Sequence, residues 1–302
     1  MSQIIECVPN FSEGRRPEIL DEIVNAIRTT GVMLLDREMD ASHHRAVVTI
    51  AGEPDTVAEA AFRGCQRAAQ LIDLDTHRGE HPRMGATDVI PFIPIRNVTM
   101  DECVALARRV GERIGRELEI PVYLYERAAT RPERRDLAYV RRGEYEAIRD
   151  EIAALPEREP DFGPRRVGKA GAVAVGARPF LIAYNVNLDT TDVQIAKDIA
   201  KITRERGGGL PSVKALGFAL EDKGIVQVSM NLTDFNVTGM LTAFQHVRAE
   251  ANKRGVRVVG SELVGLVPLE ALAQIARDAL QLEGFSSQQV VEVKLAEAEK
   301  DK

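Results

Sequence analysis

The sequence predicts an α+β protein made of two βαββαβ units. Three observations support this prediction: a chain of 302 residues has room for two modest domains, the second half follows a β-α-β-β-α-β order, and the first half repeats that order. The clearest strand is 226–232, where apolar and polar residues alternate as in a half-buried strand. It follows 213–220 across the polar residues 221–224, so the two strands form a hairpin.

The other elements of the second half complete this order. Ile195, Ile199 and Ile202 fall on one face of a helix, and a second helix ends at Gly255. Further strands are expected at residues 180–188 and 256–259. This is the ferredoxin-like split βαβ arrangement, an antiparallel sheet with both helices on one face.

The first half shows the same succession of patterns. Strands are expected at residues 4–8, 32–36, 46–50, 89–95 and 121–125, and helices from residue 17 to 27, from 57 to 72 and from 99 to 114. The last helix opens with a capping box formed by Thr99 and Glu102. We therefore expect two ferredoxin-like subdomains with antiparallel sheets, 1–179 and 180–302, and a charged, frayed tail from about residue 286.

Composition narrows the class of protein. The chain has 46 acidic and 40 basic side chains, and a net charge of −6 makes nucleic acid an unexpected partner. No apolar run approaches the ~20 residues of a membrane span, and the first residues lack the basic and apolar regions of a signal peptide. The three cysteines lie far apart, which argues against a disulfide framework. A cytoplasmic protein without a membrane partner is expected.

Four of the five histidines fall in two clusters, 43–44 and 77–81. His81 lies in a loop that leads into a predicted strand, and an imidazole titrates near neutral pH, so it is a candidate proton shuttle. The alternative is a loop histidine bonded to the backbone. His77 and His81 have the spacing of helical zinc ligands, but an intervening glycine and a following proline disfavour that helix, and no metal site is expected.

A basic, glycine-rich segment lies in the middle of the chain. Residues 163–170 follow Walker A spacing except that Ala170 stands where Ser or Thr would hold magnesium, so a nucleotide site is not expected. Arg165, Arg166 and Lys169 remain available to an anion. The seven arginines between Arg127 and Arg149 are either a solvated excursion or a basic wall for an anionic small molecule.

Two loops of the first half carry further polar candidates. Asn10 and Ser12 belong, with Glu13, to the connection between the first strand and the first helix. They are either an ordinary turn or a set that grips a small polar ligand. Glu38, Asp40 and Arg45 surround the first histidine pair.

Long motifs in the right order resemble the formiminotransferase domain family. The most specific are E-C-V-P-N-F-S-E-G at 6–14, G-E-H-P-R-M-G-A at 79–86, D-V-I-P-F-I-P at 88–94 and S-E-L-V-G-L-V-P-L at 261–269. The resemblance runs from residue 1 to about 283. It implies two ferredoxin-like subdomains, a homodimer, and folate bound between the subdomains.

The resemblance also implies a reaction and its residues. Family members transfer the formimidoyl group of N-formimidoyl-L-glutamate to N5 of tetrahydrofolate, late in histidine degradation, with tetrahydrofolate as co-substrate and no metal. The catalytic histidine falls on His81, with Glu38 and Asp40 as catalytic carboxylates, although relatives often have Asp where this chain has Glu38. The substrate- and folate-binding positions fall on Asn10, Ser12, Glu13, Arg45, Arg83, Gly163, Pro164, Arg165, Arg166, Val167, Gly168, Lys169, Ala170 and Gly171.

The chemistry fits these residue types. N5 attacks the amidine carbon and glutamate leaves as an amine, and one histidine near its neutral pKa serves first as base and then as acid. Arginines suit the carboxylates of glutamate and folate; the candidates are Arg45, Arg83, Arg165 and Arg166. Two alternatives remain: folate-dependent formyl transfer at the same site, with glutamate or 5-formyltetrahydrofolate, and a non-catalytic folate-binding protein.

Overall fold

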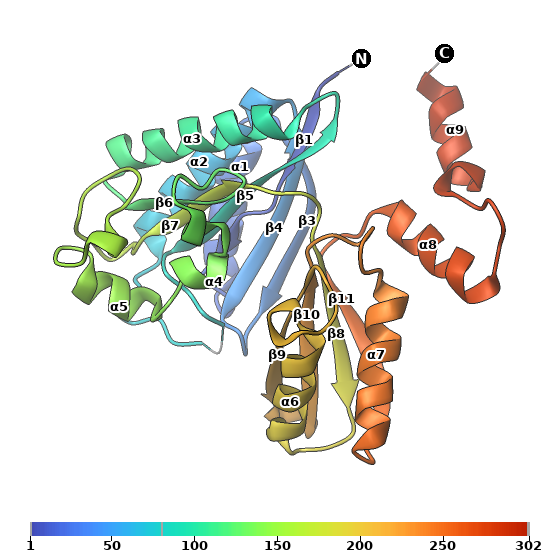
Figure 1. Cartoon of the computed structure of the whole chain (residues 1–302). Coiled ribbons are helices and arrows are strands. Elements are labelled where there is room, and N and C mark those ends of the chain that lie inside the picture. The colour runs from blue at the N-terminus through green and yellow to red at the C-terminus, as the bar shows by residue number, and fades with distance from the viewer. Residues whose placement is uncertain (1, 80, 301–302) are drawn as a thin grey trace. The chain divides into compact units, whose positions relative to one another are not determined.

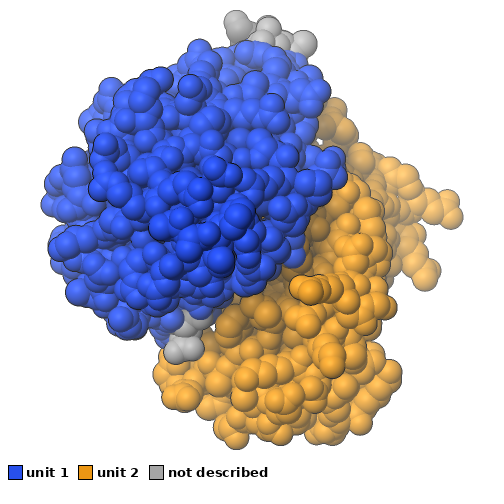
Figure 2. Space-filling view, turned by 60° about the vertical axis from the view of Figure 1, so that its left-hand side comes forward, with its two compact units in different colours: residues 1–179 blue, residues 180–302 orange. Residues whose placement is uncertain are grey.

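The computed structural model describes residues 2–79 and 81–300, which form two compact units that divide between Pro179 and Phe180 (Figure 1; Figure 2). Each unit has its own sheet and its own hydrophobic core. Within the described residues, no helix has both the length and the apolar character required to cross a lipid bilayer.

The core of the first unit is the expected four-stranded antiparallel sheet. Its strands lie in the order β5 (Thr87–Arg96), β1 (Ile4–Cys7), β4 (Arg45–Gly52) and β3 (Met33–Asp40). The short β2 (Asn10–Phe11) follows β1 and pairs with both β4 and β5. This is the ferredoxin-like order, so the predicted topology is confirmed.

The prediction of a purely antiparallel first sheet is wrong. β7 (Val173–Ala177) pairs in parallel with β5, and β6 (Val122–Glu126) pairs in parallel with β7. Parallel neighbours require a long crossover, which α3 (Met100–Glu117) and the excursion after β6 supply. The sequence does not predict β7, because the five residues of this strand follow a long charged stretch and do not alternate between apolar and polar.

Three helices cover one face of this sheet (Figure 1). They are α1 (Pro17–Arg28), α2 (Pro54–Leu71) and α3, and their apolar stripes bury residues such as Ile23, Cys65 and Ile114. The predicted capping box is present: the Thr99 side chain accepts from Glu102 N, and Thr99 N donates to the Glu102 carboxylate at 2.7 Å. These helices complete the main hydrophobic core of the first unit.

The excursion between β6 and β7 packs against the opposite face of the sheet. It contains η1 (Pro132–Arg135), α4 (Leu137–Val140), α5 (Glu144–Glu151) and η2 (Pro156–Arg158). Val140 and Ile148 join Tyr123 in a second apolar cluster there. Arg134 and Arg158 are buried in ion pairs with Asp161 and Glu151. Of the seven arginines between Arg127 and Arg149, Arg134 is buried, whereas Arg127, Arg135, Arg142 and Arg149 are exposed. The expected solvated excursion is therefore confirmed for most of these arginines and wrong for Arg134, and the alternative of a basic wall stays a prediction.

The second unit has the predicted ferredoxin-like sheet throughout. All of its pairings are antiparallel, in the order β11 (Val258–Val264), β8 (Ile182–Leu188), β10 (Ile225–Leu232) and β9 (Val213–Leu220). The helices α6 (Val193–Thr203) and α7 (Met240–Lys253) pack on the face that carries Val186 and Val228. Short 3-10 turns η3 (Glu205–Gly207) and η4 (Glu221–Lys223) flank β9.

The C-terminal stretch is helical rather than frayed. After α8 (Leu269–Leu280), η5 (Ser287–Gln289) leads into α9 (Val291–Lys300). Ser286 caps η5 in a capping box with Gln289. We did not predict this capping box from the sequence. It gives the C-terminal stretch an ordered start.

Candidate active site

The first unit brings both histidine clusters together. His43 and His44 lie in the tight turn between β3 and β4, and His77 and His81 lie in the segment that precedes β5. A Cβ on Gly79 would lie 2.6 Å from the backbone oxygen of His43, so glycine permits the two segments to approach this closely. Between them is a narrow cleft, too tight in this structure to admit a water molecule, which is lined by Ser12, His43, His44, Arg45, His77, His81, Arg83 and Asp88.

His81 faces a guanidinium. Nη1 of Arg45, the first residue of β4, lies 2.6 Å from Nε2 of His81. Burial holds the pKa of His81 well below its usual value, and the positive charges of Arg45 and Arg141 lower it further. The imidazole is therefore neutral at physiological pH, which is the state that a general base requires.

His44 and His77 form a stacked pair with ring centroids 4.1 Å apart. Nδ1 of His44 accepts from Gly14 N at 3.0 Å, and Nε2 of His77 donates to the backbone oxygen of His44 at 3.0 Å. Burial lowers the pKa of His44 to about 4 and also lowers the pKa of His77. This neutral pair links the opening loop, the β3–β4 turn and the segment before β5.

Asp40 binds His43, whose ring lies near the ring of His81. Its carboxylate accepts from His43 N at 2.7 Å and lies 3.0 Å from His43 Nδ1, and the His43 and His81 rings are 6.3 Å apart. Burial opposes ionisation of Asp40, but the bonds from His43 outweigh it and lower its pKa. Glu38 lies on β3, and its charge, like that of Asp40, acts on Arg45. The two predicted carboxylates thus surround the Arg45–His81 pair.

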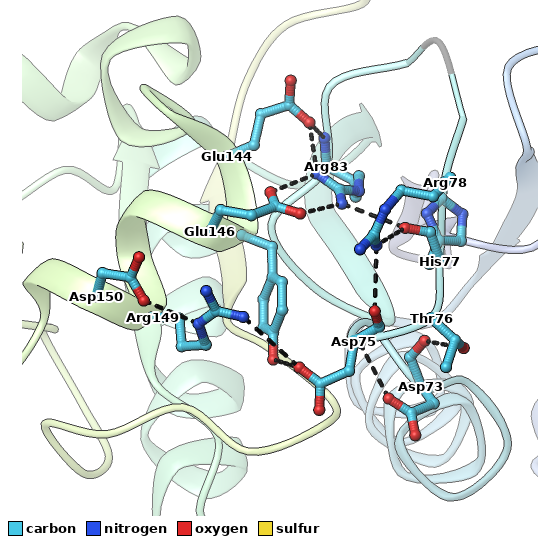
Figure 3. A network of polar contacts seen from close by, with 11 residues as sticks. Asp73, Asp75, Thr76, His77, Arg78, Arg83, Glu144, Glu146, Arg149 and Asp150 are labelled. Carbon is cyan, nitrogen blue, oxygen red and sulfur yellow. Dashed lines mark hydrogen bonds and ion pairs between the residues drawn. The ribbon is translucent and has the colours of Figure 1, made fainter.

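Arg83 is already occupied by protein carboxylates (Figure 3). Its guanidinium pairs with Glu144 at 2.7 Å and with Glu146 at 2.6 Å, and its side chain is only 8% exposed. Its backbone oxygen accepts from Tyr145 N at 3.0 Å. A guanidinium held by two carboxylates has little capacity for a third. Arg83 therefore fastens the His81 segment to α5, and its predicted role as a carboxylate receptor stays a prediction.

The opening loop uses its polar side chains mainly to hold its own shape. Asn10 Nδ2 donates to Val8 O at 2.9 Å, and Ser12 Oγ donates to Gly85 O at 2.7 Å. The fully buried Glu13 accepts from the backbone N–H groups of Arg15 and Arg16, which directly precede α1, and pairs with the Arg16 side chain. Of the three predicted positions, only Ser12 also lines the cleft.

The end of the glycine-rich segment runs beside the His81 segment. Ala86 N donates to Ala170 O at 2.8 Å, and Ala172 N donates to Met84 O at 2.9 Å. Gly171 has a φ of +70°, and a Cβ there would lie 2.4 Å from Met84 O, so only glycine fits this crossing. The structure therefore places the predicted folate-binding segment next to the predicted catalytic segment.

The basic side chains of this segment have different partners. Arg165 donates to the backbone oxygens of Ile152 and Ala153. Arg166 and Lys169 are each about 75% exposed and make surface pairs with Glu119 and Asp73. Arg165 thus holds the segment in place, whereas the other two remain accessible to a ligand.

Two functional candidates were missed from the sequence. Asp88, at the start of β5, lines the cleft, accepts from Met84 N at 2.9 Å and pairs with Arg141. Arg141 lies among seven arginines of one stretch, and nothing in their spacing separates it from the others. Arg141 comes near His81 because α4 packs on β6 and the Arg141 side chain reaches Asp88 of β5.

A wider depression adjoins the cleft and shares Arg83 with it. It measures about 440 Å³, within the range of small-molecule sites, and is lined by Arg15, Ser42, Arg78, Gly79, Arg83, Glu144 and Glu146. Within 2–79 and 81–300, no group of three His, Cys, Asp or Glu side chains is arranged to hold a metal ion. The site thus offers a neutral imidazole, guanidiniums and an adjoining space open to ligands.

Comparison with known families matches this geometry to one of them. Residues 4–178 match the N-terminal subdomain of the formiminotransferase domain, and residues 183–297 match the formiminotransferase domain. The chain belongs to the formiminotransferase domain family. The family resemblance stated from the motifs is confirmed.

Several relatives with names of this family are similar over most of the chain. A glutamate formimidoyltransferase of Thermoplasma acidophilum is 50% identical, and the alignment covers 98% of each chain. A glutamate formimidoyltransferase of Streptococcus pyogenes serotype M1 is 48% identical over 94% of this chain and 96% of its own. The mouse formimidoyltransferase-cyclodeaminase is 49% identical over 91% of this chain, which corresponds to 52% of the mouse protein.

Proposed function

We propose that this chain is a glutamate formimidoyltransferase, which transfers the formimidoyl group of N-formimidoyl-L-glutamate to N5 of tetrahydrofolate. The observation that carries the proposal is the buried, neutral His81 beside Arg45, in a chain that aligns end to end with relatives of this name. The products are 5-formimidoyltetrahydrofolate and L-glutamate, and the reaction belongs to histidine degradation.

The residues of the cleft suit each step of this reaction. N5 attacks the amidine carbon, and Nε2 of His81 takes the N5 proton as the C–N5 bond forms. The tetrahedral intermediate collapses when the C–N bond to glutamate breaks, and His81 returns its proton to the departing nitrogen. Asp40 supplies negative charge to the neighbouring His43, and Asp88 offsets the charge of Arg141, which otherwise disfavours the imidazolium that exists between the two transfers.

Tetrahydrofolate is the co-substrate in this proposal. The segment from Gly163 to Gly171 forms one wall for it, supported by the contacts of its end with Met84 and Ala86. The exposed Arg166 and Lys169 then meet the carboxylates of the folate tail. We also infer that the enzyme works in the cytoplasm as a homodimer, as the family resemblance implies.

The test is turnover by the purified protein and by its His81→Asn variant, with tetrahydrofolate and either N-formimidoyl- or N-formyl-L-glutamate. Asparagine fills similar space but does not relay a proton, so kcat should fall by ~10²–10⁴. His246→Asn, at the one histidine outside the two clusters, is the matched control and should keep wild-type turnover. A folded His81→Asn enzyme of near-wild-type turnover would exclude this role. Faster turnover of the formyl donor would identify a formyltransferase instead.

A further inference from the structure

The lone pair on Nε2 of His81 is blocked by a neighbouring side chain. With Nη1 of Arg45 at 2.6 Å, Nε2 of the neutral His81 accepts a hydrogen bond from a guanidinium. An imidazole nitrogen engaged in this way does not take a proton from a substrate amine. If His81 is the base, Arg45 has to move before the reaction begins.

Arg45 is the guanidinium near His81 that a ligand is best placed to recruit. Arg141 already pairs with Asp88, and Arg83 is held by two glutamates. Among residues 2–79 and 81–300, no carboxylate lies within ion-pair distance of Arg45. The nearby negative charges of Glu38, Asp40 and Asp88 act on it from a greater distance.

We propose that Arg45 couples substrate binding to the release of the base. In this structure Arg45 donates to Nε2 of His81, and when the amidine donor binds, Arg45 turns to a carboxylate of the donor and leaves Nε2 open to the N5 proton. A carboxylate binds a guanidinium through two charge-assisted hydrogen bonds, whereas a neutral imidazole offers one neutral acceptor. The donor therefore favours the open arrangement. This inference rests on the proposed function, because it assigns His81 the role of base.

The coupling should change the pKa of His81. Among the residues that the structure describes, the charged and titratable groups that act on the ring are Arg45 on β4, Arg141 after α4 and His43 in the β3–β4 turn. The carboxylates of β3 and of β5 act on Arg45. When a ligand carboxylate neutralises Arg45, one of the two cations that disfavour the imidazolium is compensated. The pKa of His81 should then rise.

The test follows the His81 ring by NMR in the full-length protein labelled at histidine ¹³Cε1, with His81→Asn used for assignment. L-Glutamate, the dicarboxylate product, is the probe, and calorimetry confirms its binding. Without glutamate, His81 should remain neutral down to about pH 5. With glutamate at saturation, its midpoint should move up by roughly 1–3 pH units. Failure of glutamate to bind, or an unchanged midpoint when it is bound, would overturn the proposal.

Two variants of Arg45 test whether its guanidinium causes the change in the His81 midpoint. Arg45→Gln should raise the His81 midpoint without ligand and abolish its response to glutamate, whereas Arg45→Lys should keep a low midpoint. Arg37→Gln removes a charge from β3 that pairs with Asp21 at the surface and should behave as wild type. If Arg45→Gln does not fold, the wild-type titration with glutamate decides alone. If the His81 midpoint depends on glutamate but the protein shows no turnover, the coupling stands and the proposed reaction is rejected. If the protein turns over but the His81 midpoint does not respond to glutamate, only the coupling is rejected.

Discussion

At the scale of single residues, burial sets the protonation of the histidines. His81 and the stacked pair His44–His77 come from two segments that meet between the β3–β4 turn and the start of β5, and each ring loses water there. The consequences differ, since His81 faces a guanidinium whereas His44 and His77 bind backbone groups. His44 and His77 thereby hold structure together, whereas the proposed function gives His81 the chemical role.

The His44 ring should make folding sensitive to acid. Its pKa is about 4 in the folded chain against 6.5 for the free group, so between these values the unfolded state binds the proton more strongly. Stability is therefore lost as the pH falls from 6.5 towards 4. His44→Asn keeps an acceptor for Gly14 N and does not titrate. Urea unfolding at pH 7 and pH 5 should show a loss smaller by roughly 1–3 kcal/mol in the variant. Equal losses in the two proteins would contradict this account.

At the scale of elements, the segment 163–171 combines a fixed course with exposed charges. Glycines with positive φ at Gly163 and Gly171, together with the Arg165 contacts, hold the course. Arg166 and Lys169 make only exposed ion pairs, which contribute little to stability and exchange readily for ligand contacts.

Loss of these exposed charges should weaken binding of the folate tail. We expect the Arg166→Ala, Lys169→Ala double variant to bind tetrahydrofolate pentaglutamate ~2–30-fold more weakly while its affinity for the monoglutamate hardly changes, because each exposed charge pair contributes roughly 0.2–1 kcal/mol. The wild-type preference should also shrink as salt is added. Calorimetry with both forms measures it, with Arg37→Ala as a surface control. Equal affinities for the two forms in wild type would place the tail elsewhere.

At the scale of the whole molecule, each unit has its own core, and apolar side chains remain on the last helices. Leu280 of α8 and Val291 and Leu295 of α9 are 69%, 68% and 57% exposed in the single chain. Burial of such side chains against a second copy is favourable. Light scattering should therefore give twice the 33.2 kDa of one chain. A monomer mass at micromolar concentration would contradict the proposed homodimer.

The sequence by itself determined the local elements and most of their order. Alternation at 226–232, the Thr99 capping box and the two-fold βαββαβ succession depend on neighbours within a few residues, and periodicity reports such neighbours directly. The second unit was predicted with its full strand order for this reason. The motif at 79–86, which contains His81, also indicated the correct family.

The tertiary structure alone decided the partners of charged groups and the position of β7. Arg83 meets Glu144 and Glu146 more than sixty residues away, and Arg45 meets His81 from another strand. A guanidinium looks the same in the sequence whether a ligand or a buried carboxylate satisfies it, because the free energy of an ion pair depends on distance and burial. Likewise, β7 is stabilised by the edges of β5 and β6 that it joins, and those edges exist only once the sheet has formed.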